Sequence, residues 1–350
     1  MPRYPSINGL RAISIALVVI DHLAMRCGVF NGISGIPWLR PFLDFLQDGQ
    51  LGVNVFFVIS GFLITSLLLD EEMRTKSISL KKFYIRRTLR IFPAYFFLLS
   101  VYFVLQVFKL IWIPREAWLT AITYTKYFNW PLDWYTGHAW SLSIEEHFYL
   151  LWPLIFLAGP KIRKGAAVFL ILIVPVVRTY LYFSPDNWFY DLTIFTRIDA
   201  IVTGCFLALY KKEIKAKISP YFSQIFYASL ISLFLLRYLP EVTDKLQISF
   251  ILIPFGLTHG TFSNILVGLI MMYVVFGPQG FFYKILNLRL VNYIGLLSYS
   301  IYLWQQIFLN RPNYWVNLFP QNLVCILLCS LFSYYVVEKP FLKLKRRFER

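Results

Sequence analysis

Apolar residues recur along the whole chain in long runs separated by short polar and basic segments. A run of about 17–25 apolar residues is what a helix needs to cross a bilayer. The pattern therefore predicts an all-α, polytopic membrane helix bundle of about ten transmembrane helices, with an extra apolar piece at Leu246–Leu257 that is re-entrant or interfacial. The ten predicted spans are 8–27, 51–69, 91–111, 146–158, 165–183, 197–210, 222–239, 261–277, 290–309 and 321–337.

The positions of the charged residues indicate how the predicted helices are oriented in the membrane. Lysine and arginine outnumber the acidic residues to give a net charge of +16, and they gather in alternate loops and at both termini. Positive loops mark the cytoplasmic side of a membrane protein, so we expect both termini in the cytoplasm. A nucleic-acid-binding protein would carry one continuous basic face instead. We therefore expect membrane lipids as partners and no nucleic acid.

The composition supports a membrane protein and bears on the number of its domains. The chain is 58% hydrophobic and 19% aromatic, with a mean hydropathy of +0.60. No long linker or second polar region interrupts it, so residues 1–350 are expected to form a single integral membrane domain. The four cysteines lie in or beside apolar segments at spacings that suit neither a disulfide framework nor a zinc site.

The first predicted span carries ionisable residues, which are costly inside a bilayer and mark functional sites there. Arg11 and His22 are eleven residues apart. At about 100° per residue they share one helix face, roughly 16 Å apart along the axis. The alternative for His22 is a histidine that only packs against a neighbouring helix.

Two arginines precede the third span. Arg87 and Arg90 are three residues apart, so on a helix they project from one face. Paired guanidinium groups suit the binding of phosphate. The alternative is that these residues serve membrane topology and extend to the lipid interface.

The acidic pair Glu145-Glu146 stands at the start of the fourth span. Glu145 and Tyr149 are four residues apart, so they are expected to enter the bundle on a common helix face. No His-Glu-x-x-His pattern or second ligand pair accompanies them, so no metal is expected.

Small and polar residues elsewhere in the spans leave alternatives open. Ser60-Gly61 permits close packing of helices or lines a cavity. Arg197 and Asp199 could form an ion pair within the membrane, which would be structural. In the ninth span Ser298, Tyr302 and Gln305 lie on one stripe, where they either join helices or contact a ligand.

Several fragments in this order resemble the acyltransferase 3 family of integral membrane acyltransferases. The resemblance covers nearly the whole chain, and its strength lies in the order of the fragments rather than in any one of them. The fragments are Asn8-Gly9-Leu10-Arg11 with His22, Phe56-Phe57-Val58-Ile59-Ser60-Gly61-Phe62, Arg86-Arg87-Thr88-Leu89-Arg90-Ile91-Phe92-Pro93-Ala94-Tyr95, Trp140-Ser141-Leu142-Ser143-Ile144-Glu145-Glu146-His147-Phe148-Tyr149, Arg197-Ile198-Asp199 with Gly204, Ser298-Tyr299-Ser300-Ile301-Tyr302-Leu303-Trp304, and Glu338-Lys339-Pro340.

The resemblance implies transfer of an acyl group, usually acetyl from cytoplasmic acetyl-CoA, to a carbohydrate hydroxyl. It implies that Arg11 and His22 form the family's signature pair, that Arg87 and Arg90 are its paired arginines, and that Glu145 is its acidic position. This chain departs from the family at Gln305, where a histidine is frequent, and at Ile307, where a proline is frequent. The C-terminal SGNH hydrolase-like domain of many members is not expected here, which indicates the stand-alone form.

Together these observations give a hypothesis for the site. Arg87, Arg90 and Tyr149 bind acetyl-CoA, with Arg11 further along its path. His22 acts as general base or forms an acetyl-histidine intermediate, and Glu145 or Asp21 orients its imidazole or tunes its charge. The remaining candidates are substrate-binding residues, namely Asp21, Trp140, Ser141, Arg197, Asp199 and Tyr302.

Two other classes of function stay open. A proton-coupled transporter or flippase of a glycan or lipid-linked sugar could use His22, Glu145 and Asp199 as a relay. A membrane scaffold would need none of them. For the acyltransferase the expected partners are acyl-CoA and a carbohydrate acceptor such as O-antigen, exopolysaccharide or peptidoglycan, in the bacterial inner membrane, and a homo-oligomer is left open.

Overall fold

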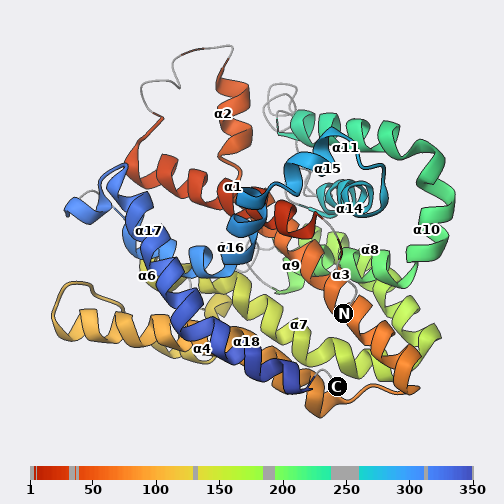
Figure 1. The fold of residues 1–350 in the computed structure, drawn as a ribbon, viewed down its shortest axis with the longest axis horizontal. Helices are drawn as coiled ribbons and strands as arrows, with labels where there is room; N and C mark the ends of the chain where they lie inside the picture. The colour runs from red at the N-terminus through yellow and green to blue at the C-terminus, as the bar shows by residue number, and fades with distance from the viewer. Residues whose placement is uncertain are drawn as a thin grey trace.

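Helices make up every regular element in the residues that the computed structural model describes, which confirms the all-α class (Figure 1). These residues are 4, 6–30, 36, 39–128, 133–183, 194–237, 260–310 and 314–348. The α-helices are α1 (Ile7–Cys27), α2 (Arg40–Leu46), α3 (Gly49–Thr75), α4 (Leu80–Val107), α5 (Arg115–Ile122), α6 (Trp134–Gly137), α7 (Ala139–Leu157), α8 (Pro160–Phe183), α9 (Ile194–Leu209), α10 (Lys211–Ile218), α11 (Phe222–Leu236), α14 (Thr261–Phe276), α15 (Phe281–Leu286), α16 (Arg289–Phe308), α17 (Gln321–Phe332) and α18 (Lys339–Lys345). Short 3-10 turns are η1 (Lys126–Phe128), η3 (Ser219–Tyr221), η5 (Trp315–Asn317) and η7 (Arg346–Phe348), and η6 (Ser333–Glu338) is a π-helix.

Each of the ten predicted spans coincides with a helix, the last of them with α17 and η6 together. Within the described residues, six helices are long and apolar enough to cross a membrane: α1, α3, α4, α8 as far as Leu181, the continuous stretch Lys211–Leu236, and the continuous stretch Gln321–Phe348. The count of ten and the cytoplasmic termini therefore stay predictions. The predicted piece Leu246–Leu257 lies outside the described residues.

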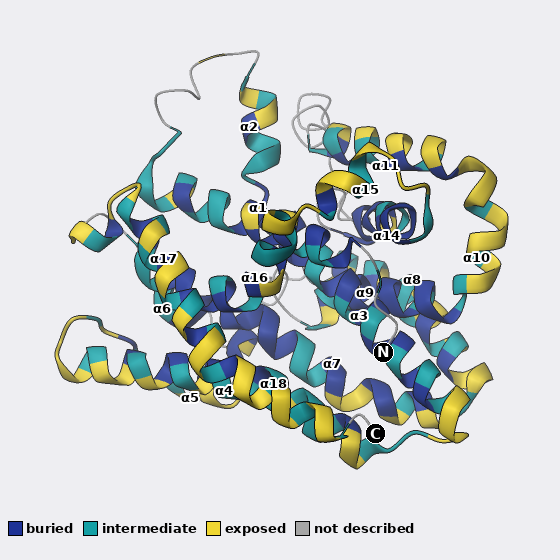
Figure 2. Cartoon of the chain, in the orientation of Figure 1, coloured by how far each residue is buried: buried dark blue, intermediate teal, exposed yellow. Residues whose placement is uncertain are grey.

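Large apolar side chains face outward on the long helices, as lipid contact requires. On α8, Phe169, Leu172 and Val176 are each at least 60% exposed, and Figure 2 shows exposed positions along the outer sides of α4 and α18, while α9 and α14 are largely buried. A chain in water would bury such side chains. The structure is that of a multi-pass membrane protein.

Glycines bring the inner helices into close contact. A Cβ at Gly61 of α3 would lie 1.8 Å from the Ile201 carbonyl oxygen of α9, and one at Gly204 of α9 would lie 2.0 Å from the Val58 carbonyl oxygen of α3. A Cβ at Gly295 of α16 would similarly meet the backbone of α1. Small residues are the usual means by which membrane helices approach closely.

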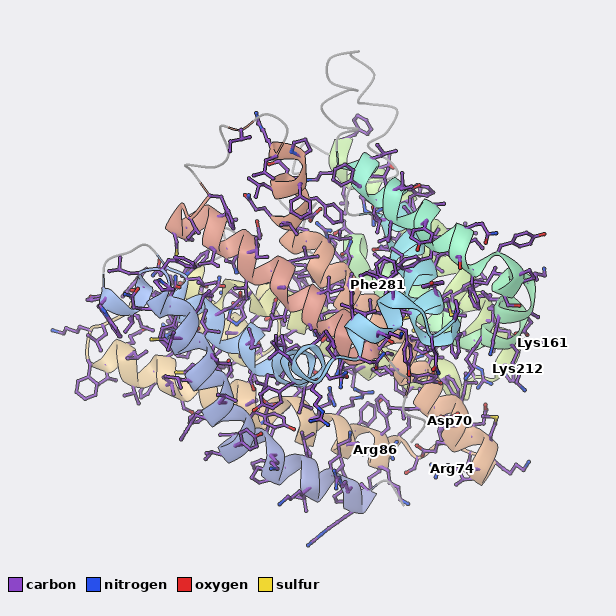
Figure 3. The ribbon with its side chains drawn as sticks, turned by 45° about the horizontal axis from the view of Figure 1, so that its top comes forward. Asp70, Arg74, Arg86, Lys161, Lys212 and Phe281 are labelled. Carbon is purple, nitrogen blue, oxygen red and sulfur yellow. The ribbon has the colours of Figure 1, made fainter. Side chains whose placement is uncertain are left out.

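The segments predicted to face the cytoplasm gather at one end of the molecule, where Figure 3 labels Arg74, Arg86, Lys161 and Lys212. Side-chain contacts join these segments to one another although they are far apart in sequence. The contacts are Lys211 Nζ to Tyr4 Oη (3.2 Å), Asn287 Nδ2 to Ser6 Oγ (2.7 Å), Arg163 Nη2 to Glu72 Oε2 (2.8 Å), Lys164 Nζ to Glu213 Oε1 (3.8 Å) and Arg86 Nη1 to the Phe348 carbonyl oxygen (3.0 Å). The basic loops and the residues near both termini therefore share one side, which we call the basic end.

The opposite end is joined in the same way. The Sγ of Cys27, at the end of α1, lies 3.9 Å from the Asn310 carbonyl oxygen, and Asn310 Nδ2 donates to Tyr135 Oη at 2.9 Å. Cys27 ends α1, Tyr135 lies in α6 just before α7, and Asn310 follows α16, so these three chain segments, which are predicted to face the side opposite to the cytoplasm, lie together. Alternate loops thus collect at opposite ends, as a bundle of membrane-crossing helices requires.

Candidate functional site

A cavity of about 360 Å³ lies between α1, α3, α4, α7, α16 and the η6–α18 segment. Its walls include residues of the basic end, such as Tyr4 and Lys345, and residues deep between the helices, such as Ser141 and Tyr302. The volume falls within the range of about 300–1,000 Å³ that is typical of small-molecule sites.

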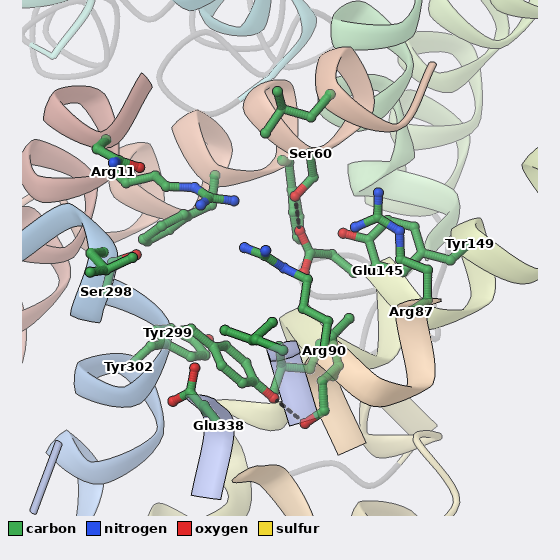
Figure 4. A pocket seen from close by; sticks show the side chains of 18 of the residues that line it. Arg11, Ser60, Arg87, Arg90, Glu145, Tyr149, Ser298, Tyr299, Tyr302 and Glu338 are labelled. Carbon is green, nitrogen blue, oxygen red and sulfur yellow. Dashed lines mark hydrogen bonds between the residues drawn. The ribbon is translucent and has the colours of Figure 1, made fainter. Parts of the chain in front are cut away.

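Three arginines face this cavity. Figure 4 shows Arg11 of α1 and Arg90 of α4 extending toward each other, with Arg87 beside the Tyr149 ring. The Arg87 guanidinium carbon lies 5.1 Å from the centroid of that ring. Within the described part of the chain, no carboxylate oxygen lies within 4.0 Å of any of the three guanidinium groups. Three unpaired cations around one cavity form a site for an anion.

Carboxylates occupy other parts of the cavity wall. Glu145 accepts a hydrogen bond from Ser60 Oγ at 2.6 Å (Figure 4), and Glu338, the last residue of the π-helix, accepts one from Ser300 Oγ. The charge of Glu145 acts on Arg11 and on Arg87. The arginines are thus held around a carboxylate without being neutralised by a direct ion pair.

The predicted helix faces are confirmed here. Arg87 lines the cavity with Arg90, and Glu145 lines it with Tyr149. On α3 both alternatives for the small residues hold, since Ser60 lines the cavity while Gly61 packs against α9.

At its deep end the cavity is bounded by hydroxyl groups. Ser141 Oγ of α7 and Tyr302 Oη of α16 lie 2.6 Å apart, and Tyr302 Oη donates to the His138 carbonyl oxygen at 2.7 Å. Ser298, one turn before Tyr302, also lines the cavity. The polar stripe predicted on α16 therefore runs from the cavity wall toward Gln305.

His22 lies beyond this deep end rather than in the cavity wall. Its Nδ1 is 3.2 Å from Gln305 Oε1, and its ring meets the Trp134 ring edge-on at 5.4 Å. Among the described residues, the hydrogen bond that orients this imidazole comes from Gln305 and not from Glu145 or Asp21. Glu145 is bonded to Ser60, and Asp21 lies against Gly49 at the start of α3.

The ion pair predicted between Arg197 and Asp199 is wrong. Asp199 Oδ2 pairs instead with Arg178 Nη2 of α8 at 2.9 Å and accepts from Thr261 Oγ1 at 2.6 Å. Side chains two residues apart on a helix point to nearly opposite sides, so Arg197 and Asp199 are poorly placed to pair with each other. Neither Arg197 nor Asp199 is among the described residues of the cavity wall.

Trp140 is buried beside the cavity and packs against Phe57, with ring centroids 6.1 Å apart. The neighbouring residue Ser141 is in the wall itself. Of the predicted substrate-binding residues, the structure thus brings Ser141 and Tyr302 to the cavity and leaves the others outside it.

Two residues at the site had no predicted role. Glu338 carries a carboxylate into the cavity from a π-helix, an element frequent at functional sites. His138 is 5% exposed and packs against Tyr302, with ring centroids 5.4 Å apart. An ionisable residue in or beside an apolar span is a signal in its own right, and it marks both positions in the sequence.

An ion pair outside the spans holds the segment that carries His138. The Lys126 ammonium of η1 pairs with Asp133, which caps α6 by accepting from the Thr136 backbone N–H at 2.8 Å. Burial raises the pKa of the Asp133 carboxyl, but the Lys126 charge and the hydrogen bonds outweigh it and hold that pKa below its usual value. Because His138 directly follows α6, this pair fixes its place.

Comparisons with known proteins point to one family. The family described as acyltransferase domain matches residues 4–338. The chain is 30% identical over 382 residues to the O-acetyltransferase OatA of Staphylococcus aureus, covering 98% of this chain and 58% of that protein. It is 28% identical over 393 residues to the peptidoglycan O-acetyltransferase OatA of Listeria monocytogenes, covering 97% of this chain and 56% of that protein. The chain thus spans less than two thirds of the length of these relatives. No solved structure matches it.

Proposed function

This chain belongs to the acyltransferase domain family, and we propose that it is a membrane O-acetyltransferase that moves an acetyl group from acetyl-CoA to a hydroxyl of a cell-envelope glycan. The observation that carries this proposal is the set of three unpaired arginines, Arg11, Arg87 and Arg90, around one cavity. A scaffold has no use for such a set, because half-buried cations of like charge around one cavity are costly without an anion.

The arginines suit the phosphates of CoA. A guanidinium group offers a planar fork of donors that matches two phosphate oxygens at once. Arg87 and Arg90 stand on the part of α4 nearest the basic end, and Arg11 stands across the cavity from them (Figure 4). A donor held there by its phosphates would extend its pantetheine arm along the cavity toward Ser141 and Tyr302.

His22 is the proposed base, since neutral imidazole can take a proton near pH 7. Its nitrogen removes the proton of the acceptor hydroxyl as that oxygen attacks the thioester carbon. The carbon–sulfur bond then breaks, and the thiolate of CoA takes the proton from the imidazolium. In the competing mechanism the imidazole itself attacks the thioester carbon, and the C–S bond breaks to release the CoA thiolate and leave an acetyl-histidine. The acceptor hydroxyl then attacks that acetyl group, the bond between nitrogen and the acetyl carbon breaks, and the hydroxyl proton passes to the thiolate.

For the acceptor we propose a glycan of the bacterial cell envelope, reached from the end opposite to the basic end. His22 lies toward that end of α1, with Trp134 and Gln305 beside it. The name of the relative from Listeria monocytogenes includes peptidoglycan, which supports an envelope glycan as acceptor. The proposed location is the bacterial cytoplasmic membrane.

The test uses the full chain purified in detergent, with radiolabelled acetyl-CoA to measure binding and turnover. Arg87→Ala and Arg90→Ala should each weaken acetyl-CoA binding by about tenfold, the loss of a charge-assisted phosphate contact. His22→Ala should bind acetyl-CoA as the wild type does and lose turnover. Arg74→Ala is the matched control, because Arg74 is an exposed arginine of the basic end outside the cavity (Figure 3).

Acetyl-CoA bound and consumed by the wild type, with these effects of the variants, would support the acetyltransferase. A wild type that neither binds nor consumes acetyl-CoA would overturn it and favour the transporter, which moves its substrate without covalent change. Equal weakening in Arg74→Ala would show that the cavity arginines act only through the overall charge of the basic end.

A further inference from the structure

His138 is a buried histidine beside the cavity, and its ring makes no well-formed hydrogen bond to the described residues. It is 5% exposed, and although the Tyr135 backbone lies near enough to act on the ring, neither Nδ1 nor Nε2 reaches a partner at normal hydrogen-bond geometry. Gln305, which is fully buried, likewise has no partner there for its Nε2. Buried polar atoms of native proteins are nearly always paired, so each exception needs an explanation.

The place of His138 connects the two parts of the site. Its ring lies against Tyr302, whose hydroxyl is in the cavity wall and donates to the His138 carbonyl oxygen. His22 is close enough for its charge to act on His138. Trp134, four residues earlier, contacts the His22 ring directly. His138 thus stands between the deep end of the cavity and the proposed base.

The structural contacts of the His138 backbone do not require an imidazole side chain. Its backbone carbonyl accepts from Tyr302, and its backbone lies where α6 ends and α7 begins, so these roles do not depend on the side chain. An apolar side chain would fill the same space without leaving two polar atoms unpaired, which costs free energy. A polar group that arrives with the substrates would give these ring nitrogens their partner.

We propose that His138 is a further catalytic residue, whose N–H donates a hydrogen bond to the carbonyl oxygen of the thioester. This inference rests on the proposed acetyl transfer. The acceptor oxygen attacks the carbonyl carbon while His22 takes its proton, and the electron pair of the C=O bond moves to oxygen. The His138 N–H stabilises that oxyanion until the pair re-forms C=O and expels the thiolate, which takes the proton from His22.

The experiment measures turnover and acetyl-CoA affinity for the full chain in detergent. His138→Ala should lower kcat by about 10²–10³, the effect of removing one oxyanion donor, with the acetyl-CoA Kd unchanged within about twofold. His138→Asn and His138→Gln place an amide N–H near the positions of Nδ1 and Nε2, and at least one of them should recover about tenfold over alanine. His147→Ala is the matched control on α7, the helix that directly follows His138, because His147 bonds Tyr127 Oη at 2.8 Å and is not in the cavity wall.

Turnover of His138→Ala within about threefold of the wild type would overturn the role of His138 while leaving the acetyltransferase standing. If His138→Ala does not fold, His138→Asn and His138→Gln decide the question. If both of these variants fold and neither turns over acetyl-CoA above the background rate, the donor role is contradicted. If the wild type does not bind acetyl-CoA, the proposed function itself is overturned, and the role of His138 falls with it.

Discussion

The side-chain oxygen of Gln305 lies 3.2 Å from Nδ1 of His22, across the contact between α16 and α1. An amide oxygen can only accept a hydrogen bond, so Nδ1 carries the proton in this arrangement. The other ring nitrogen, Nε2, then holds the free electron pair that a base or nucleophile needs. Gln305 thus does for His22 what an orienting residue does for a catalytic histidine.

The contact gives a prediction for Gln305. Gln305→Leu removes the acceptor, so His22 loses its fixed tautomer and turnover should fall by about tenfold or more. Gln305→Glu keeps an acceptor oxygen at the same place and should lose less. The acetyl-CoA Kd should be unchanged in both variants, because Gln305 lies outside the cavity wall. Equal turnover of Gln305→Leu and wild type would contradict this role.

The contact between α3 and α9 predicts a large loss of stability at Gly204. In Gly204→Ala the new Cβ would lie 2.0 Å from the Val58 carbonyl oxygen, which forces the helices apart. We expect a loss of about 1–3 kcal/mol or more, as for other overpacked interiors. Gly165→Ala is the control, since no described atom beyond its own helix backbone lies within 4 Å of the place that its Cβ would take. Thermal unfolding in detergent measures both, and equal midpoints would disprove the close contact.

The buried pair of Arg178 and Asp199 predicts strong coupling between two substitutions. Arg178→Met leaves the Asp199 carboxylate buried without its cation, which should cost about 3–5 kcal/mol. Combining it with Asp199→Leu removes both charges and should restore most of the loss. Thermal unfolding in detergent measures the stability of the wild type, of each single variant and of the double variant. Additive losses would show that the two side chains act independently.

The pair of Lys126 and Asp133 predicts a pH dependence. The pKa of Asp133 in the folded protein is below its usual value, so the stabilisation is fully present above the unfolded pKa of about 4 and is lost as pH falls through the folded value. In Lys126→Met the buried carboxylate has no cation, and burial then raises its pKa instead. Protonation relieves that carboxylate as the pH falls.

Lys126→Met should therefore be about 3–5 kcal/mol less stable than the wild type at pH 7, and the difference should shrink toward pH 4. Unfolding midpoints at several pH values measure the difference. The conservative variant Lys126→Arg keeps the charge and is the control for packing around the loop. A constant difference between Lys126→Met and wild type across this range would show that the lost stability has another cause.

The helices could be predicted from the sequence because a membrane span is a local property. Hydropathy alone located all ten predicted helices, and the helical period placed Arg87 beside Arg90 and Glu145 beside Tyr149. In each case the relationship is between residues about one turn apart. Such relationships follow from helix geometry and need no knowledge of the neighbouring helices.

The partners of His22 and Asp199 could not be predicted in this way. Gln305 is 283 residues from His22 in sequence, and Arg178 lies on a different helix from Asp199. Which helix covers which face depends on the packing of the whole bundle, which hydropathy does not encode. The sequence therefore placed the charged groups of the site on helices but could not pair them.

The glycines separate two ways in which the helices around the cavity pack against one another. Gly61, Gly204 and Gly295 interlock α1, α3, α9 and α16 backbone to backbone, whereas neither α4 nor the continuous α17–η6–α18 segment contains a glycine. Those two elements carry Arg87, Arg90 and Glu338. The cavity therefore has one side built on side-chain packing, which carries the arginines of α4 and Glu338, and one side built on backbone contact, whose helices also carry His22 and Gln305 beyond its deep end.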